Sequence, residues 1–176
     1  ISLGRINEEI VVRKRFRAAT ANPDRCPASR RFDAERRYAW TLSEDSDFVL
    51  RPIYTIVEAP VMAMVMPYCV HGSLDLLCRR PLSYVFSLLL MTDAAKGVAH
   101  AHAFNVILRD VKPGNCLVGA DGVARLADFE LVRHQRTGGP GLRSPVDVRT
   151  GRHAGRVAET GAALRRRPRR EAAQNF

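Results

Sequence analysis

The segment 108–132, LRDVKPGNCLVGADGVARLADFELV, constrains the fold more than any other part of the chain. Its turn signal Gly-Ala-Asp-Gly (119–122) lies between two short apolar runs, 116–118 and 124–127, and this pattern predicts a β-hairpin. Charged and amide side chains flank the hairpin at fixed spacing: Asp110, Lys112, Asn115 and Asp128. This joint spacing favours a functional site over a set of ordinary turn residues.

Apolar patterns before this segment predict two strand regions and one helix. A β-rich run predicts a strand over 8–16, and the stretch 48–66 predicts two strands joined at 58–60. Between them, a helix is predicted over 29–42, with Ser29 as its N-cap. Its apolar face is predicted to contain Phe32, Tyr38 or Ala39, and Leu42.

A second, longer helix is predicted over 82–104, opened by Pro81. The 3.6-residue period places these residues on one face: Val85, Leu88, Leu89, Thr92, Ala95, Val98 or Ala99, and His102. The order of elements is therefore strands with one helix, then a helix and a short hairpin. This order predicts an α+β fold.

Charge divides the chain near His134. Residues 135–176 contain ten Arg and three acidic residues, which is +7 of the formal net charge of +10. This stretch is rich in Gly and Pro and shows no periodicity, so we predict a disordered basic tail. The apolar fraction of 46% suits a globular core in the remainder.

Two further classes of protein are disfavoured. The four cysteines are scattered without a C-x-x-C pair, which argues against a disulfide framework or a zinc site. The longest apolar runs are too short to span a bilayer, and no signal peptide is recognised. We therefore expect no membrane partner and a cytoplasmic location, with the Arg-rich tail as an argument for the nucleus.

Several motifs of residues 1–134 resemble, in order, those of the protein kinase family, chiefly its serine/threonine branch. Val11-Val-Arg-Lys14 resembles the strand whose Lys holds the ATP phosphates, and Glu35 lies where the family places its partner acid. The residues alone also allow Glu35 a surface i,i+4 pair with Arg31. The resemblance implies a two-lobed fold, with residues 1–66 as a β-rich upper lobe and 67–134 as the hinge and an incomplete helical lower lobe.

The segment 62–73 resembles the family's fifth strand and hinge, which bind adenine. Met66 falls at the gatekeeper position, and the resemblance implies that Pro67, Cys69 and Ser73 contribute to ATP binding. Pro67 lacks an N–H, but the family uses the carbonyl at this position, so the substitution is compatible with adenine binding.

The family's catalytic roles fall on the residues around the hairpin. The resemblance implies that Asp110 accepts the substrate hydroxyl proton and that Lys112 lies near the transferred phosphate. It also implies that Asn115 and Asp128 hold Mg²⁺, a hard cation that prefers oxygen ligands. ATP and Mg²⁺ are therefore the expected cofactors, and a protein substrate or regulatory protein is the expected partner.

The sequence departs from the family pattern at two residues of this region. Leu108 replaces His, and Glu130 replaces the last Gly of Asp-Phe-Gly. The added carboxylate is expected either to weaken ATP binding or to act as a metal ligand. Neither a glycine-rich loop nor an Ala-Pro-Glu motif is recognised, so the kinase-like region is expected to be truncated.

Three functions follow from these observations as alternatives. The first is phosphoryl transfer from Mg-ATP to a protein hydroxyl. The second is a catalytically weak or inactive kinase-like binding module, favoured by Glu130. The third is non-specific nucleic-acid binding by the Arg-rich tail alone, for which a solvated tail is the simpler interpretation.

Overall fold

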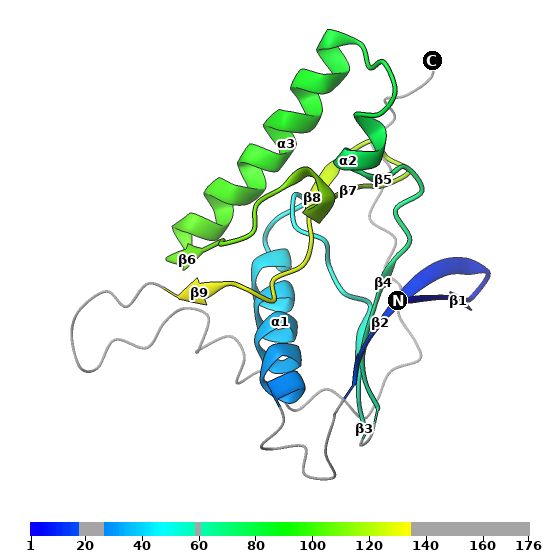
Figure 1. The fold of residues 1–176 in the computed structure, drawn as a ribbon, viewed down its shortest axis with the longest axis vertical. Helices are drawn as coiled ribbons and strands as arrows, with labels where there is room; N and C mark the ends of the chain where they lie inside the picture. The colour runs from blue at the N-terminus through cyan, green and yellow to red at the C-terminus, as the bar shows by residue number, and fades with distance from the viewer. Residues whose placement is uncertain (18–26, 59–60, 135–176) are drawn as a thin grey trace.

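The computed structural model describes residues 1–17, 27–58 and 61–134. A four-stranded antiparallel sheet has the order β1-β2-β4-β3 (Figure 1). Its strands are β1 (Ser2–Ile6), β2 (Glu9–Arg17), β3 (Tyr54–Glu58) and β4 (Val61–Pro67). The strands predicted over 8–16 and within 48–66 are therefore confirmed, while β1 was not predicted.

Helix α1 (Pro27–Ser43) runs beside this sheet (Figure 1). The predicted face is confirmed, because Phe32, Tyr38, Ala39 and Leu42 are all buried. The N-cap prediction is wrong: the helix begins at Pro27, so Ser29 lies inside its first turn and is itself buried. The physical reason is that Pro suits the first helical turn, where the N–H that it lacks would have no partner.

The rest of the described chain contains two helices and two small sheets. Its helices are α2 (Leu74–Leu77) and α3 (Tyr84–Ala103), which begin after the caps Ser73 and Ser83. A three-stranded sheet has the order β5-β7-β8, formed by Gly72–Ser73, Cys116–Val118 and Ala124–Leu126. Strands β6 (Val106–Ile107) and β9 (Arg133–His134) pair, and the short 3-10 helix η2 spans Pro113–Asn115. The predicted hairpin is thus confirmed as β7 and β8.

The predicted buried face of α3 is wrong. Val85, Leu88 and Leu89 are exposed, whereas Leu90, Gly97 and Ala101 are buried. The helix is apolar on more than one side, so its periodicity does not single out the face that packs. The small residues decide the contact instead: a Cβ on Gly97 would lie 2.7 Å from the carbonyl oxygen of Phe48.

Residues 48–50 connect the two parts of the molecule through backbone hydrogen bonds. Leu50 N donates to Leu126 O at 2.8 Å, and Leu126 N donates to Phe48 O at 2.9 Å. The first strand predicted within 48–66 therefore begins only at Tyr54, because residues 48–50 bind β8 instead.

A single core cluster runs through the described residues. It extends from Leu42 and Met64, on α1 and β4, to Leu90, Val118 and Phe129 on the other side of the molecule. The architecture is mixed α+β, as the sequence predicts. Among the described residues, no helix is long and apolar enough to cross a membrane. The predicted basic tail, 135–176, lies outside the described residues.

Candidate functional site

Strand β2 and helix α1 bring Lys14 and Glu35 together. Lys14 Nζ lies 2.8 Å from Glu35 Oε1 and 2.9 Å from Oε2. The Glu35 side chain is 1% exposed and that of Lys14 is 18% exposed. The surface i,i+4 alternative for Glu35 is therefore wrong, since packing against β2 buries this residue.

Asp128 completes a three-residue cluster with this pair. Lys14 Nζ lies 3.1 Å from Asp128 Oδ1, so one ammonium group contacts two carboxylates that are 93 residues apart in the chain. Asp128 adopts a φ of 63°, a left-handed conformation that is uncommon outside Gly, Asn and Asp. Asp is therefore one of the few side chains that suit this position.

The titration of this cluster follows from burial and from its unequal charges. Burial opposes the charged form of Lys14, but attraction to Glu35 and Asp128 outweighs it and raises the pKa of Lys14. Burial raises the pKa of Glu35, with repulsion from Asp128 and Glu130 adding to it and Lys14 partly offsetting it. Burial is therefore the main cause of the Glu35 shift, whereas the Lys14 shift comes from the acids around it and is opposed by burial.

Asp110, Lys112 and Asn115 form a second polar group before β7. Lys112 Nζ lies 2.6 Å from Asp110 Oδ2, and Asn115 Nδ2 donates to Asp110 O at 2.9 Å and to Oδ2 at 3.0 Å. The hydrogen bond from Lys112 lowers the pKa of Asp110; slight desolvation opposes this shift, and Asn115 adds to it.

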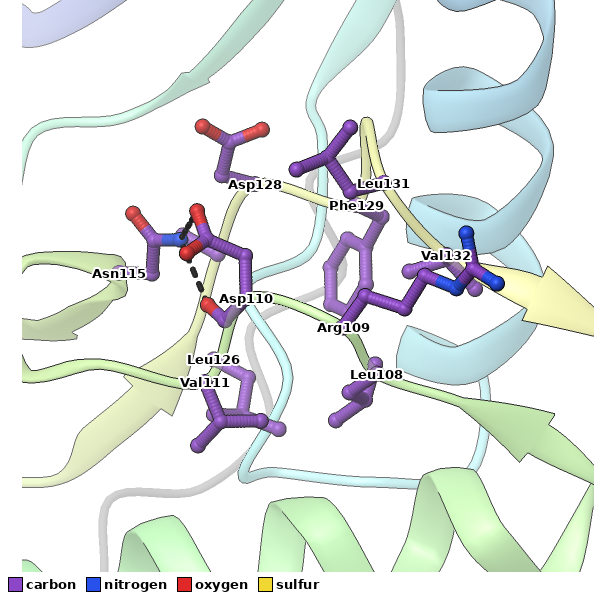
Figure 2. Close-up of a pocket in the computed structure, with 11 residues that line it drawn as sticks. Leu108, Arg109, Asp110, Val111, Asn115, Leu126, Asp128, Phe129, Leu131 and Val132 are labelled. Atoms are coloured by element: carbon purple, nitrogen blue, oxygen red, sulfur yellow. Dashed lines mark hydrogen bonds between the residues drawn. The ribbon is translucent and has the colours of Figure 1, made fainter.

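The hairpin brings this second group close to Asp128. Ala127 N donates to Asn115 O at 2.8 Å, which fixes the approach of Asp128 to the 110–115 segment. Figure 2 shows the Asn115 amide nitrogen directed at Asp110, with its amide oxygen on the opposite side. Two oxygen-bearing side chains, Asn115 and Asp128, therefore border the same space.

A pocket lies between the 108–115 and 126–132 segments. Asp110, Asn115 and Asp128 line its polar part (Figure 2). Leu108 and Phe129 both line its apolar part, and Leu108 packs against the core cluster. Leu108 therefore keeps an apolar contact at the position where the resemblance expects His.

The predicted hinge residues lie at and after the end of β4. Met66 pairs with Val12, and Pro67 pairs with Val11. Val12 and Lys14 are two residues apart on β2, so Met66 lies on the same face of the sheet as Lys14. Cys69 is buried, and its carbonyl accepts from Gly72 N at 2.9 Å. The Ser73 hydroxyl caps α2 by accepting from Leu76 N at 3.4 Å, a structural contact that the sequence reasoning did not include.

Glu130 lies in this site together with a residue that the sequence reasoning did not assign to it. Arg31 Nη1 of α1 lies 3.1 Å from Glu130 Oε1. One carboxylate oxygen from each of Glu35, Asp128 and Glu130 lies within 4.8 Å of the others, an arrangement that could hold a cation. The sequence singles out Glu130, because it replaces the Gly that the family has at this position. No local pattern identifies Arg31 as its partner.

Comparisons with known proteins identify the family of the chain. The model of the protein kinase domain family matches residues 3–150. Because the match covers most of the chain, the chain belongs to the protein kinase family.

Individual relatives match shorter segments. The serine/threonine-protein kinase cst-1 of Caenorhabditis elegans is 41% identical over 69 residues, which cover 38% of this chain and 14% of that kinase. Human serine/threonine-protein kinase TAO2 is 40% identical over 68 residues, covering 38% of this chain and 6% of TAO2. The tyrosine-protein kinase Btk of Drosophila melanogaster is 33% identical over 105 residues, covering 54% of this chain and 12% of Btk. The chain thus aligns with only a small part of each of these relatives.

Proposed function

We propose that the chain binds Mg-ATP beside the Lys14–Glu35–Asp128 cluster, as a serine/threonine-type protein kinase domain. The single observation that carries this proposal is that Lys14 contacts both Glu35, at 2.8 Å, and Asp128, at 3.1 Å. A lysine held by a buried carboxylate is fixed in position, and its charge suits the phosphates of a nucleotide. The pairing with Asp128 brings that charge next to the acid proposed to bind the metal.

The donor set fits magnesium. Asp128 offers a carboxylate, and Asn115 offers an amide oxygen because its amide nitrogen is used by Asp110. Mg²⁺ is usually bound by one or two such side chains together with phosphate oxygens and water. When bound, Mg-ATP supplies the transferable phosphoryl group, and Mg²⁺ neutralises charge on it.

The adenine is proposed to bind at the chain after β4. The proposed acceptor is the carbonyl of Pro67 and the proposed donor is the N–H of Cys69, with Met66 beside them at the back of the site. Met66 is partly buried against the core and shares a sheet face with Lys14, which supports this location. Ser73 is proposed to contribute through its position at the start of α2.

Asp110 is the proposed general base for a substrate hydroxyl. Its carboxylate would accept the hydroxyl proton while that oxygen bonds to the γ-phosphorus and the bond to the ADP oxygen breaks. Asn115 and Lys112 orient this carboxylate through contacts of 3.0 and 2.6 Å. The Lys112 ammonium would then also lie near the transferred phosphate, as in serine/threonine kinases.

One observation favours the second candidate function, nucleotide binding with little transfer. Glu130 adds a third carboxylate within 4.8 Å of Glu35 and Asp128. This charge repels the phosphates and competes for the cation, so the geometry needed for transfer is harder to reach. We therefore expect weak Mg-ATP binding and slow transfer.

The test combines calorimetric titration with Mg-ATP and transfer of labelled phosphate to a generic protein substrate. Three proteins are compared: the unchanged chain, Asp128→Asn, and Asp75→Asn as a matched control on the exposed helix α2. We expect binding in the unchanged chain and in the control, and an affinity at least about tenfold lower in Asp128→Asn, equal to about 1.4 kcal/mol.

Two results would change the proposal. If no nucleotide binds to the unchanged chain, nucleotide binding is excluded and the kinase-like fold serves another purpose. Fast transfer that Asp128→Asn abolishes would instead support full kinase activity and would reject the binding-only candidate.

A further inference from the structure

Glu130 contacts helix α1 at a defined distance from Glu35. Its partner Arg31 lies four residues before Glu35, so both side chains leave the same side of the helix. From that side, Glu35 reaches Lys14 on β2 and Arg31 reaches Glu130 after β8. Helix α1 is thereby tied to the sheet and to the Asp128 segment at two successive turns.

The charges of the three acids make both contacts favourable. Glu35, Asp128 and Glu130 have carboxylate oxygens within 4.8 Å, and like charges at this separation repel one another. Lys14 contacts the first two acids, and Arg31 contacts the third. With Arg31 in place, the extra carboxylate attracts the helix rather than repelling it.

We propose that Arg31 and Glu130 are a positioning pair that holds α1 where Glu35 meets Lys14. This inference deepens the proposed function and rests on it, since Lys14 is the residue proposed to bind the phosphates. Neither residue needs to touch the nucleotide, because both act through the position of α1. The pair compensates for the Glu that the chain carries in place of the family's Gly.

Two other roles for Glu130 predict different behaviour. If Glu130 acts only as a nearby negative charge, removing it and removing Arg31 change the site in opposite directions. If Glu130 is a metal ligand, its loss matters only when a divalent cation is present, and Arg31 is irrelevant. A positioning pair predicts the same change from either substitution, with or without a cation.

The experiment measures how fast the Lys14 amine reacts with an acylating reagent, by mass spectrometry, with no nucleotide or metal present. The chain has only three lysines, so Lys96 and Lys112 are internal references. Lys14 reacts slowly while Glu35 and Asp128 hold its ammonium, because acylation requires a free neutral amine. The variants are Arg31→Gln, Glu130→Gln, the two combined, Arg31→Lys, and Arg30→Gln as a control for net charge one residue earlier on the helix.

We expect Arg31→Gln and Glu130→Gln each to raise the Lys14 rate about two- to fivefold, the range for an exposed ion pair. The double variant should equal the larger single change, while Arg31→Lys and Arg30→Gln should stay near the unchanged chain. Opposite changes in the two single variants, or an equal change in Arg30→Gln, would overturn the proposal. Unfolding would raise all three lysines together, and failure of nucleotide binding would leave this result intact.

Discussion

The two halves of the site differ in how they are held. Lys14 and Glu35 meet in the interior between β2 and α1, with side chains 18% and 1% exposed. Asp110 and Lys112 meet at the surface, with side chains 35% and 55% exposed. The buried half joins residues distant in the chain, whereas the exposed half is formed within six consecutive residues, 110–115.

Because of this difference, a substitution in the buried half changes both the stability of the fold and the chemistry of the site, whereas one in the exposed half changes mainly the chemistry. A charge in the buried half cannot be removed without leaving its partner desolvated, so the fold and the site are coupled there. In the exposed half, water can replace a lost partner, so chemistry can be changed while the fold is kept.

The largest effect is expected for Lys14→Met. This change leaves the buried Glu35 without its nearest cation, and we expect the free energy of unfolding to fall by about 3 kcal/mol. Arg15→Met on the exposed side of the same strand is the matched control and should change it by less than about 0.5 kcal/mol. Urea denaturation of both variants measures the difference.

A double variant sharpens this result. Lys14→Met combined with Glu35→Leu removes both buried charges, and it should recover most of the lost stability. If Lys14→Met alone is as stable as the unchanged chain, the buried half is no more coupled to the fold than the exposed half.

Two glycines test the difference between a buried and an exposed position without a change of charge, although Gly97 lies outside both halves of the site. A Cβ on Gly97 of α3 would lie 2.7 Å from Phe48 O and 3.0 Å from the Leu126 side chain, so Gly97→Ala should cost about 1–3 kcal/mol. A Cβ on Gly114, in the exposed half, meets no atom within 4 Å, and Gly114→Ala should be neutral or stabilise by about 0.5 kcal/mol. Thermal or urea unfolding compares them, and equal losses would contradict the contrast.

The smallest effect concerns the titration of Asp110. The Lys112 hydrogen bond lowers the pKa of Asp110 below its ordinary value of 3.8. Because this pKa is lower in the folded chain, the contact stabilises the fold above about pH 4 and is lost on further acidification. In Lys112→Met, the Asp110 midpoint from a carboxyl-carbon NMR titration should rise toward 3.8. The free energy of unfolding at neutral pH should fall only slightly, because the contact is exposed to water. An unchanged midpoint would show that Lys112 does not hold this carboxylate.

Helix α1 illustrates what could be predicted from the sequence. Its large apolar residues fall on one side, with Glu35 as a buried charged residue among them, so the pattern identifies the packed face correctly at Phe32 and Leu42. The hairpin was predictable for a similar reason, since Gly119 and Gly122 mark its turn. In both elements, local chemistry and the final packing agree.

Helix α3 illustrates what could not be predicted. It carries apolar residues on several sides, and the buried side is selected by the close approach of Gly97 to the 48–50 segment. The Arg31–Glu130 contact is of the same kind, because it depends on how a helix and a distant turn are juxtaposed. Short strands such as β5 and β9 have too few residues for a periodic pattern. They are strands only because they pair with β7 and β6, which lie elsewhere in the chain.

The hydrogen-bonded seam between residues 48–50 and Leu126 has a mechanical consequence for helix α1. The seam anchors the chain five residues after the C-terminal end of α1, so we expect a tilt of the helix to pivot near Ser43. At 1.5 Å per residue, Glu35 lies about 12 Å and Arg31 about 18 Å from that pivot. A rotation of about 10° displaces Glu35 by about 2 Å, enough to break its contact with Lys14. Because Arg31 lies farther from the pivot than Glu35, it can resist the same rotation with about two thirds of the force that Glu35 would need.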